Sequence, residues 1–296
     1  MTAPEELTRR WAVAVVGVPA ALMLFYFGGW ILGVPVAILA GIGARELCRL
    51  GAQKGVQAFS GVAVSGAAAL VLAATWRPTF SEFAPMAVAV IGAVLLLSFV
   101  LALSRRGISG RPLEVVSTTL LGCTYVGLTL SFLPLLHELP SAEGWGAVVP
   151  KPWIGLAVIA LPVAATWIGD SVAFFAGTRW GRSKIVPAIS PNKSWVGSWS
   201  GLGGAMVAAM VWYMVAAPHL PGVPIGGLAV AALVGAVLGV CAQVGDLIVS
   251  LLKREAGVKD TGTIFPGHGG VLDRLDALAV TLPASFALFA LLTRVG

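Results

Sequence analysis

Long stretches without a charged residue, separated by short loops that hold Lys and Arg, dominate this 296-residue chain. Only 11% of the residues are charged, against about 25% in soluble domains, so charged side chains cannot cover a water-facing surface. An apolar run of about 20 residues crosses a bilayer as a helix, because lipid offers no partner to exposed backbone groups. The sequence therefore predicts an all-α, polytopic integral membrane helix bundle.

Nine membrane-spanning helices are expected from the spacing of charges and helix breakers. The charge-free run 11–44 is too long for one upright helix and is interrupted by Gly28 and Gly29. A second double-length run, 194–245, is divided by prolines within residues 218–224. The expected helices cover residues 11–27, 29–44, 55–76, 83–104, 115–137, 152–169, two stretches within 194–245, and 277–293.

The distribution of basic residues orients these helices. With a cytoplasmic N-terminus, all of the 19 Lys and Arg residues except Arg77, Lys151 and Arg294 fall in cytoplasmic segments. The positive-inside rule requires such a bias. We therefore expect a multi-pass protein of the cell inner (plasma) membrane whose active site faces the cytoplasm. Residues 1–150 form an N-terminal region of about five helices, and residues 151–296 form a C-terminal catalytic region.

Four aspartates of the second half lie where a charge is costly. Asp170 ends a long apolar run, and Asp246 interrupts another. Ionisable side chains at such depth are candidates for function, although a single one also fits a helix end whose carboxylate reaches the interface. Asp273 and Asp276 are spaced to share one face of a helix. Their hard oxygens favour Mg²⁺ over a soft metal, and both the number of ions and the presence of a monovalent one stay open.

The segment 250–276 also combines cations with glycines. Its basic side chains suit phosphate oxygens, and its glycines permit close backbone approach to a ligand. Together with the carboxylates they indicate a metal–phosphate site, and the alternative is a solvated loop of mixed charge. The cations are Lys253, Arg254, Lys259 and Arg274, and the glycines are Gly262, Gly267, Gly269 and Gly270.

A second basic loop surrounds Ser-Pro-Asn-Lys-Ser-Trp at residues 190–195. Its cations either set the orientation in the membrane, form a patch for lipid headgroups, or cradle an anionic substrate, which we favour. His268 is the histidine that lies within a polar cluster; its role as a base, a metal ligand, a phosphate donor or a purely structural loop residue stays open. The four cations of this loop are Arg179, Arg182, Lys184 and Lys193.

Segment 250–276 resembles the signature of the bacterial phosphatidate cytidylyltransferases, also called CDP-diacylglycerol synthases. It contains Ser-x-x-Lys-Arg, Lys-Asp, Pro-Gly-His-Gly-Gly and Asp-Arg-x-Asp. The Gln-Val-Gly-Asp-Leu that contains Asp246 and the Gly-Asp-Ser at 169–171 resemble other parts of the family's pattern. The likeness covers about residues 165–280. Two positions in that range where the family often has Glu carry valine instead: Val196 and Val249.

The resemblance implies that CTP and phosphatidic acid react to give CDP-diacylglycerol and pyrophosphate. Such a transfer needs positioning and charge neutralisation more than covalent help, so we expect no enzyme nucleophile. The expected catalytic residues are Asp246, Asp273, Lys253, Arg254, His268 and Arg274. The expected substrate-binding residues are Lys193, Ser194, Asp170, Ser171, Ser250, Lys259, Asp260, Gly269 and Gly270. The expected metal ligands are Asp246, Asp273, Asp276 and Asp170.

Other classes of protein predict different patterns. An ion-coupled transporter would place polar residues near the bilayer centre in both halves of the chain, and the first half has almost none. Another Mg²⁺-dependent lipid-phosphate transferase or a lipid kinase would use a similar site, and only the resemblance disfavours it. A non-catalytic scaffold has no use for so dense a charged cluster. We expect CTP, phosphatidic acid and membrane lipids as partners, no nucleic acid, and leave a homodimer open.

Overall fold

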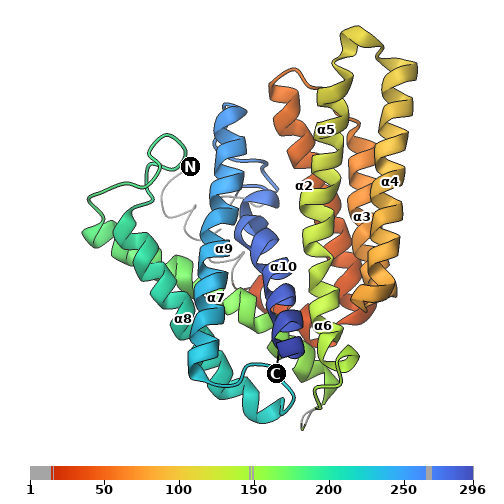
Figure 1. Cartoon of the computed structure of the whole chain (residues 1–296). Helices are drawn as coiled ribbons and strands as arrows, with labels where there is room; N and C mark the ends of the chain where they lie inside the picture. Colours follow the sequence, from red (N-terminus) through yellow and green to blue (C-terminus); the bar gives the residue numbers. More distant parts are fainter. Residues whose placement is uncertain (1–14, 16, 147, 149, 265–268, 296) are drawn as a thin grey trace. The chain divides into compact units, whose positions relative to one another are not determined.

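The fold is that of a computed structural model, which describes residues 15, 17–146, 148, 150–264 and 269–295 (Figure 1). Helices account for the regular structure of these residues, apart from one isolated antiparallel bridge between Lys184 and Ser194. The α-helices are α2 (Gly29–Gln53), α3 (Ser60–Trp76), α4 (Phe80–Arg105), α5 (Pro112–Gly122), α6 (Phe132–Ala142), α7 (Lys151–Trp180), α8 (Trp195–Ala216), α9 (Leu228–Glu255) and α10 (Leu272–Val295). Shorter helical turns are η1 (Ile108–Gly110), the π-helix η2 (Cys123–Leu128) and η3 (Ala217–His219).

Seven helical segments are long and apolar enough to cross a membrane in the described part of the chain. This confirms the prediction of an all-helical membrane protein. Two shorter apolar helices, Gly17–Phe27 and Ser60–Trp76, add to the seven. The seven segments are Gly29–Gln53, Phe80–Arg105, Pro112–Ala142, Lys151–Trp180, Trp195–His219, Leu228–Glu255 and Leu272–Arg294.

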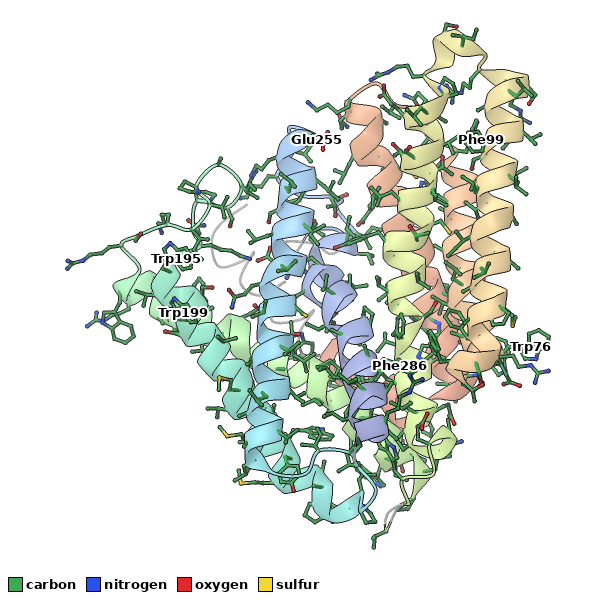
Figure 2. All side chains as sticks on the ribbon, in the orientation of Figure 1. Trp76, Phe99, Trp195, Trp199, Glu255 and Phe286 are labelled. Carbon is green, nitrogen blue, oxygen red and sulfur yellow. The ribbon has the colours of Figure 1, made fainter. Side chains whose placement is uncertain are left out.

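Large apolar side chains on the outside of the helices fit a lipid environment. Trp76 and Phe99 are 60% and 49% exposed, and Trp199 is 66% exposed (Figure 2). In water such exposure would be unfavourable, whereas lipid tails cover it. The outer faces of these helices therefore suit contact with lipid.

The chain divides into two compact units. Unit 1 holds residues 1–135 and 252–275, and unit 2 holds residues 136–251 and 276–296. In unit 1, α2, α3, α4 and α5 pack side by side (Figure 1). The loop that precedes α10 belongs to this unit as well. The division at residue 150 into an N-terminal and a C-terminal membrane region stays a prediction.

Unit 2 is built on a close antiparallel pair of helices, α7 and α8. A Cβ added at Gly201 of α8 would lie 2.9 Å from the carbonyl oxygen of Gly169 in α7. Small residues bring membrane helices into backbone contact, where dispersion and weak hydrogen bonds replace the missing hydrophobic drive. The close pair fixes the part of α7 that carries Asp170 against the first half of α8. The basic loop joins the two helices after Trp180.

Candidate active site

A short hairpin between α7 and α8 sets the position of Lys193 in unit 2. The amide of Ile185 donates to the Lys193 carbonyl at 3.2 Å, and the amide of Trp195 donates to the Ser183 carbonyl at 3.1 Å. Ser194 then caps α8, because its buried hydroxyl accepts the amide of Gly197 at 3.2 Å. The predicted Ser194 therefore has a helix-capping role in the structure.

Lys193 points to a carboxylate on α9. Its ammonium lies 2.9 Å from Oδ2 of Asp246 and donates to the Gln243 carbonyl at 3.2 Å. The hydroxyl of Ser250 donates to Oδ1 of the same aspartate at 3.2 Å. The side chains of Lys193 and Asp246 are 22% and 38% exposed. The pair is thus ordered by the protein but open to a ligand.

Asp170 lies within the electrostatic reach of this group, because the charges of Asp246 and Lys193 both act on it. Lys193 and Asp246 balance each other as an ion pair, so the additional charge of Asp170 favours a cation. Among the described residues, no three His, Cys, Asp or Glu side chains gather to hold a metal by themselves. Mg²⁺ at phosphate sites commonly uses one or two carboxylates together with substrate phosphates and water. The donor set of Asp170 and Asp246 therefore fits Mg²⁺ in the presence of a phosphate ligand.

Gln243 is a further polar residue of this group, and sequence reasoning assigned it no role. Its side-chain amide donates to the Ser198 carbonyl at 3.1 Å, and its Oε1 accepts the Ser198 hydroxyl. This reciprocal pair ties α9 to the first turn of α8. Since the Gln243 carbonyl also receives Lys193, the residue fixes both the helix and the cation. Ser171, in contrast, donates back to Trp167 within α7 at 2.7 Å.

A second polar group lies in unit 1 around Asp273, at the start of α10. Its Oδ1 receives the ammonium of Lys253 at 2.7 Å. Its Oδ2 receives the Thr261 amide at 2.8 Å, the Thr261 hydroxyl at 2.9 Å and the Gly270 amide at 2.9 Å. The Asp273 side chain is only 4% exposed. The carboxylate therefore holds together the described parts of the loop between α9 and α10.

Glu46 of α2 joins this second group, and sequence reasoning missed it. It is 1% exposed and accepts the amides of Val271 and Leu272 at 3.0 and 2.8 Å. The available signal was that Glu46 is the single acidic residue between Glu6 and Glu82 and sits between Arg45 and Arg49. A lone acid in an apolar helix is expected to have a partner, but its partner is more than 200 residues away along the chain.

The remaining predicted residues differ in burial and in the unit to which they belong. In unit 1, Gly269 has a φ of 82°, which favours glycine, and Gly270 is buried beside Asp273. Asp276 belongs to unit 2 and accepts the following Ala277 amide at 2.8 Å. His268 lies outside the described residues. Four predicted residues are solvent-accessible in unit 1: Arg254, Lys259, Asp260 and Arg274.

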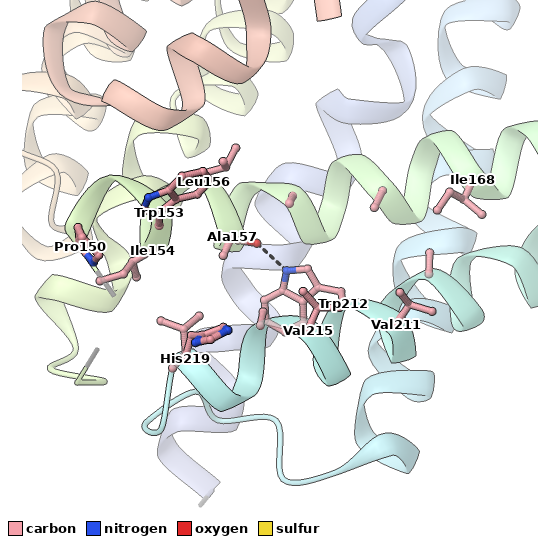
Figure 3. Close-up of a pocket in the computed structure, with 15 residues that line it drawn as sticks. Pro150, Trp153, Ile154, Leu156, Ala157, Ile168, Val211, Trp212, Val215 and His219 are labelled. Atoms are coloured by element: carbon pink, nitrogen blue, oxygen red, sulfur yellow. Dashed lines mark hydrogen bonds between the residues drawn. The ribbon is translucent and has the colours of Figure 1, made fainter. Parts of the chain in front are cut away.

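Unit 2 also contains a large groove, and its lining is mostly apolar, unlike that of the polar groups. It has a volume of about 610 Å³ between α7 and α8, and Trp212 crosses it to donate to the Ala157 carbonyl at 2.5 Å (Figure 3). Among the described residues, no Asp, Glu, Lys or Arg lines it. Ile168 lines the groove, and Asp170, two positions on, points to a different side of α7 because each helical residue turns about 100°. The groove therefore offers nothing to a polyanionic substrate.

Comparisons with known proteins show the family to which this sequence is similar. The sequence model of the cytidylyltransferase family matches residues 8–292. A phosphatidate cytidylyltransferase of Synechocystis is 31% identical over 96% of this chain and 97% of its own length. The enzyme of that name from Bacillus subtilis is 31% identical over 70% of this chain and 68% of its own length. One from Haemophilus influenzae is 38% identical over 45% of each chain.

Proposed function

Because the chain belongs to the cytidylyltransferase family, we propose that it transfers CMP from CTP to phosphatidic acid, giving CDP-diacylglycerol and pyrophosphate. The observation that carries the proposal is the almost full-length likeness to the Synechocystis enzyme. The two polar groups support it, because both combine carboxylates with a lysine. CTP and phosphatidic acid are both polyanions, and cations must bring them together.

The proposed reaction is a single displacement at phosphorus. A phosphate oxygen of phosphatidic acid forms a bond to the α-phosphorus of CTP, and the bond between that phosphorus and the bridging oxygen to the β-phosphorus breaks. Pyrophosphate leaves with the bond's electron pair. Positioning and charge neutralisation supply most of the rate in such transfers. No covalent enzyme intermediate is needed.

We assign Mg²⁺ to Asp170 and Asp246, with Asp273 and Asp276 as further proposed ligands. When bound, the ion supplies positive charge to the triphosphate oxygens. Of the four carboxylates, Asp273 is the least available to a metal ion, since its two oxygens already accept four hydrogen bonds from the protein. Lys193 has a hydrogen-bond partner in Asp246 until a phosphate oxygen competes for its ammonium.

Further phosphate contacts are proposed for the exposed basic residues near α10. Arg guanidinium groups bind phosphate oxygens in pairs, whereas a lysine acts as a point charge. These residues lie in or beside the described parts of the loop that Asp273 holds. The proposed contacts are Arg254, Lys259 and Arg274.

We further propose nine spans with a cytoplasmic N-terminus, counting the helices Gly17–Phe27 and Ser60–Trp76 with the seven longer segments. The excess of Lys and Arg in alternate loops supports this orientation. It places the basic loop before α8 and the loop before α10 on the cytoplasmic face of the inner membrane. A soluble nucleotide and a lipid of the inner leaflet meet there.

The direct test uses the purified full chain with labelled CTP, phosphatidic acid and Mg²⁺. We expect a labelled CDP-lipid and free pyrophosphate, and we expect excess EDTA to stop the reaction until Mg²⁺ is restored. Unchanged turnover in EDTA would remove the metal from the proposal. A product labelled from ATP and not from CTP would instead indicate a lipid kinase.

Replacement of Lys193 by Ala is expected to raise the KM for one of the two anionic substrates about 10- to 100-fold, the cost of a lost charge-assisted hydrogen bond. Lys184→Ala is the matched comparison on the same hairpin. Its ammonium contacts the Asn192 carbonyl at 3.5 Å, so a smaller effect is expected. Steady-state kinetics with each substrate varied in turn measure both variants. Equal, wild-type constants would assign Lys193 to membrane orientation.

A further inference from the structure

We propose that Glu46, a buried residue of α2, is a positioning residue for the described parts of the loop between α9 and α10 (residues 256–264 and 269–271). The inference rests on the proposed function, because that loop carries residues assigned to the phosphates. Glu46, Lys253, the described parts of the loop and the first residues of α10 all belong to unit 1. The N-terminal half of the chain thereby contributes directly to the shape of the site.

The carboxylate of Glu46 binds the backbone where the loop becomes a helix. Its Oε1 accepts the Val271 amide at 3.0 Å, and its Oε2 accepts the Leu272 amide at 2.8 Å. The Leu272 amide is the first of α10 and the Val271 amide comes just before it, so no helical carbonyl is available to either. A carboxylate at this end is also favoured by the helix dipole. Glu46 therefore does from a distant helix what a capping residue does locally.

The hydroxyl of Thr261 lies between Glu46 and the other buried carboxylate of unit 1, 3.1 Å from Oε2 of Glu46 and 2.9 Å from Oδ2 of Asp273. Its single proton can be donated to either carboxylate. Thr261 is 6% exposed, and Val271 and Leu272 are 1% and 2% exposed. Water cannot replace these contacts without opening the loop. Glu46 and the Asp273–Lys253 pair thus hold the loop at Thr261 and again at residues 270–272.

Two glycines of the loop fit against the Glu46 carboxylate. A Cβ added at Gly270 would lie 2.5 Å from both carboxylate oxygens, and one added at Gly262 would collide with Oε1. Gly262 does not have a positive φ. An alanine there is excluded by contact with Glu46 and not by backbone strain. At least this part of the glycine pattern follows from the buried acid, not from a bound phosphate.

The test compares Glu46→Gln with Glu82→Gln, a control at an exposed glutamate of α4. In Glu46→Gln, one carboxylate oxygen becomes an NH2 group, which cannot accept the hydrogen bond of the Val271 or Leu272 amide that it faces. We expect kcat per folded molecule to fall about 10- to 100-fold, the equivalent of one charged hydrogen bond. Hydrogen exchange of peptides that cover residues 269–275 should become faster, and the control should match the wild type. Wild-type kcat in folded Glu46→Gln would overturn the proposal.

A double-mutant cycle tests the contact itself. Gly262→Ala alone should lower kcat, whereas Gly262→Ala added to Glu46→Ala should have a clearly smaller further effect, because the colliding carboxylate is gone and only the Gly270 Cα, 3.3 Å from the added Cβ, stays close. Gly203→Ala, where an added Cβ meets nothing within 4 Å, is the control glycine. Losses of kcat that multiply in the double variant would show that the two residues act independently and would contradict the inference.

The exchange experiment needs no substrate. If the wild type forms no CDP-lipid, the proposed function fails while the exchange result still tests Glu46.

Discussion

Replacement of Asp246 by Asn is expected to lower kcat about 10³-fold, the upper range for removing one preorganised electrostatic group. The amide keeps the size of the side chain and can still accept the Ser250 hydroxyl. It loses the charge that balances Lys193 and that we assign to Mg²⁺. Asp170 alone would then offer a carboxylate in this group, and Lys193 would face a neutral partner.

Turnover of the Asp246 variant is measured with both substrates saturating, after size-exclusion chromatography shows a folded protein. Glu143→Gln is the matched control, since Glu143 is an exposed acid of unit 2. We expect wild-type turnover for it. Raising the Mg²⁺ concentration should recover part of the activity of Asp246→Asn if the lost group binds the ion. Turnover near the wild-type value would exclude Asp246 from catalysis.

Replacement of Asp273 by Asn is expected to destabilise the protein by about 3–5 kcal/mol, because it leaves a mostly buried ammonium without its partner. Lys253 is 13% exposed and lies 2.7 Å from Asp273. The Asn oxygen can replace Oδ2 toward Thr261 and Gly270, but the Asn NH2 group then faces the Lys253 ammonium in place of the acceptor Oδ1. Activity should be lost together with the structure of the loop.

Thermal unfolding in detergent, with and without Mg²⁺, separates the two roles considered for Asp273. If its main task is to hold the loop, the variant unfolds at a lower temperature in both conditions. Lys253→Met, which removes the other member of the pair and fills the space with an apolar chain, should recover stability when combined with Asp273→Asn. A variant of normal stability that is inactive and insensitive to Mg²⁺ would instead favour direct metal binding.

The sequence alone predicted an all-helical membrane protein and selected several of the polar residues that the structure brings together, but not their division into two groups. Long apolar runs predicted helices that the structure contains, and the segment 250–276 pointed to the family that the comparisons identify. Lys193 and Asp246 were both selected, and the structure brings them together. The helix-capping hydrogen bond of Ser194 was not foreseen, and its predicted contact with substrate stays a prediction.

Hydropathy, charge bias and motif spacing are local properties, so one sequence sufficed for the membrane character, the helical fold and the family. Partners that lie far apart along the chain were decided only by packing. Glu46 meets Leu272 across 226 positions, and Gln243 meets Ser198 across 45. A buried carboxylate takes whichever donors the packed helices bring to it, because leaving it unpaired is too costly. That selection depends on three-dimensional distance, which no local pattern in the sequence encodes.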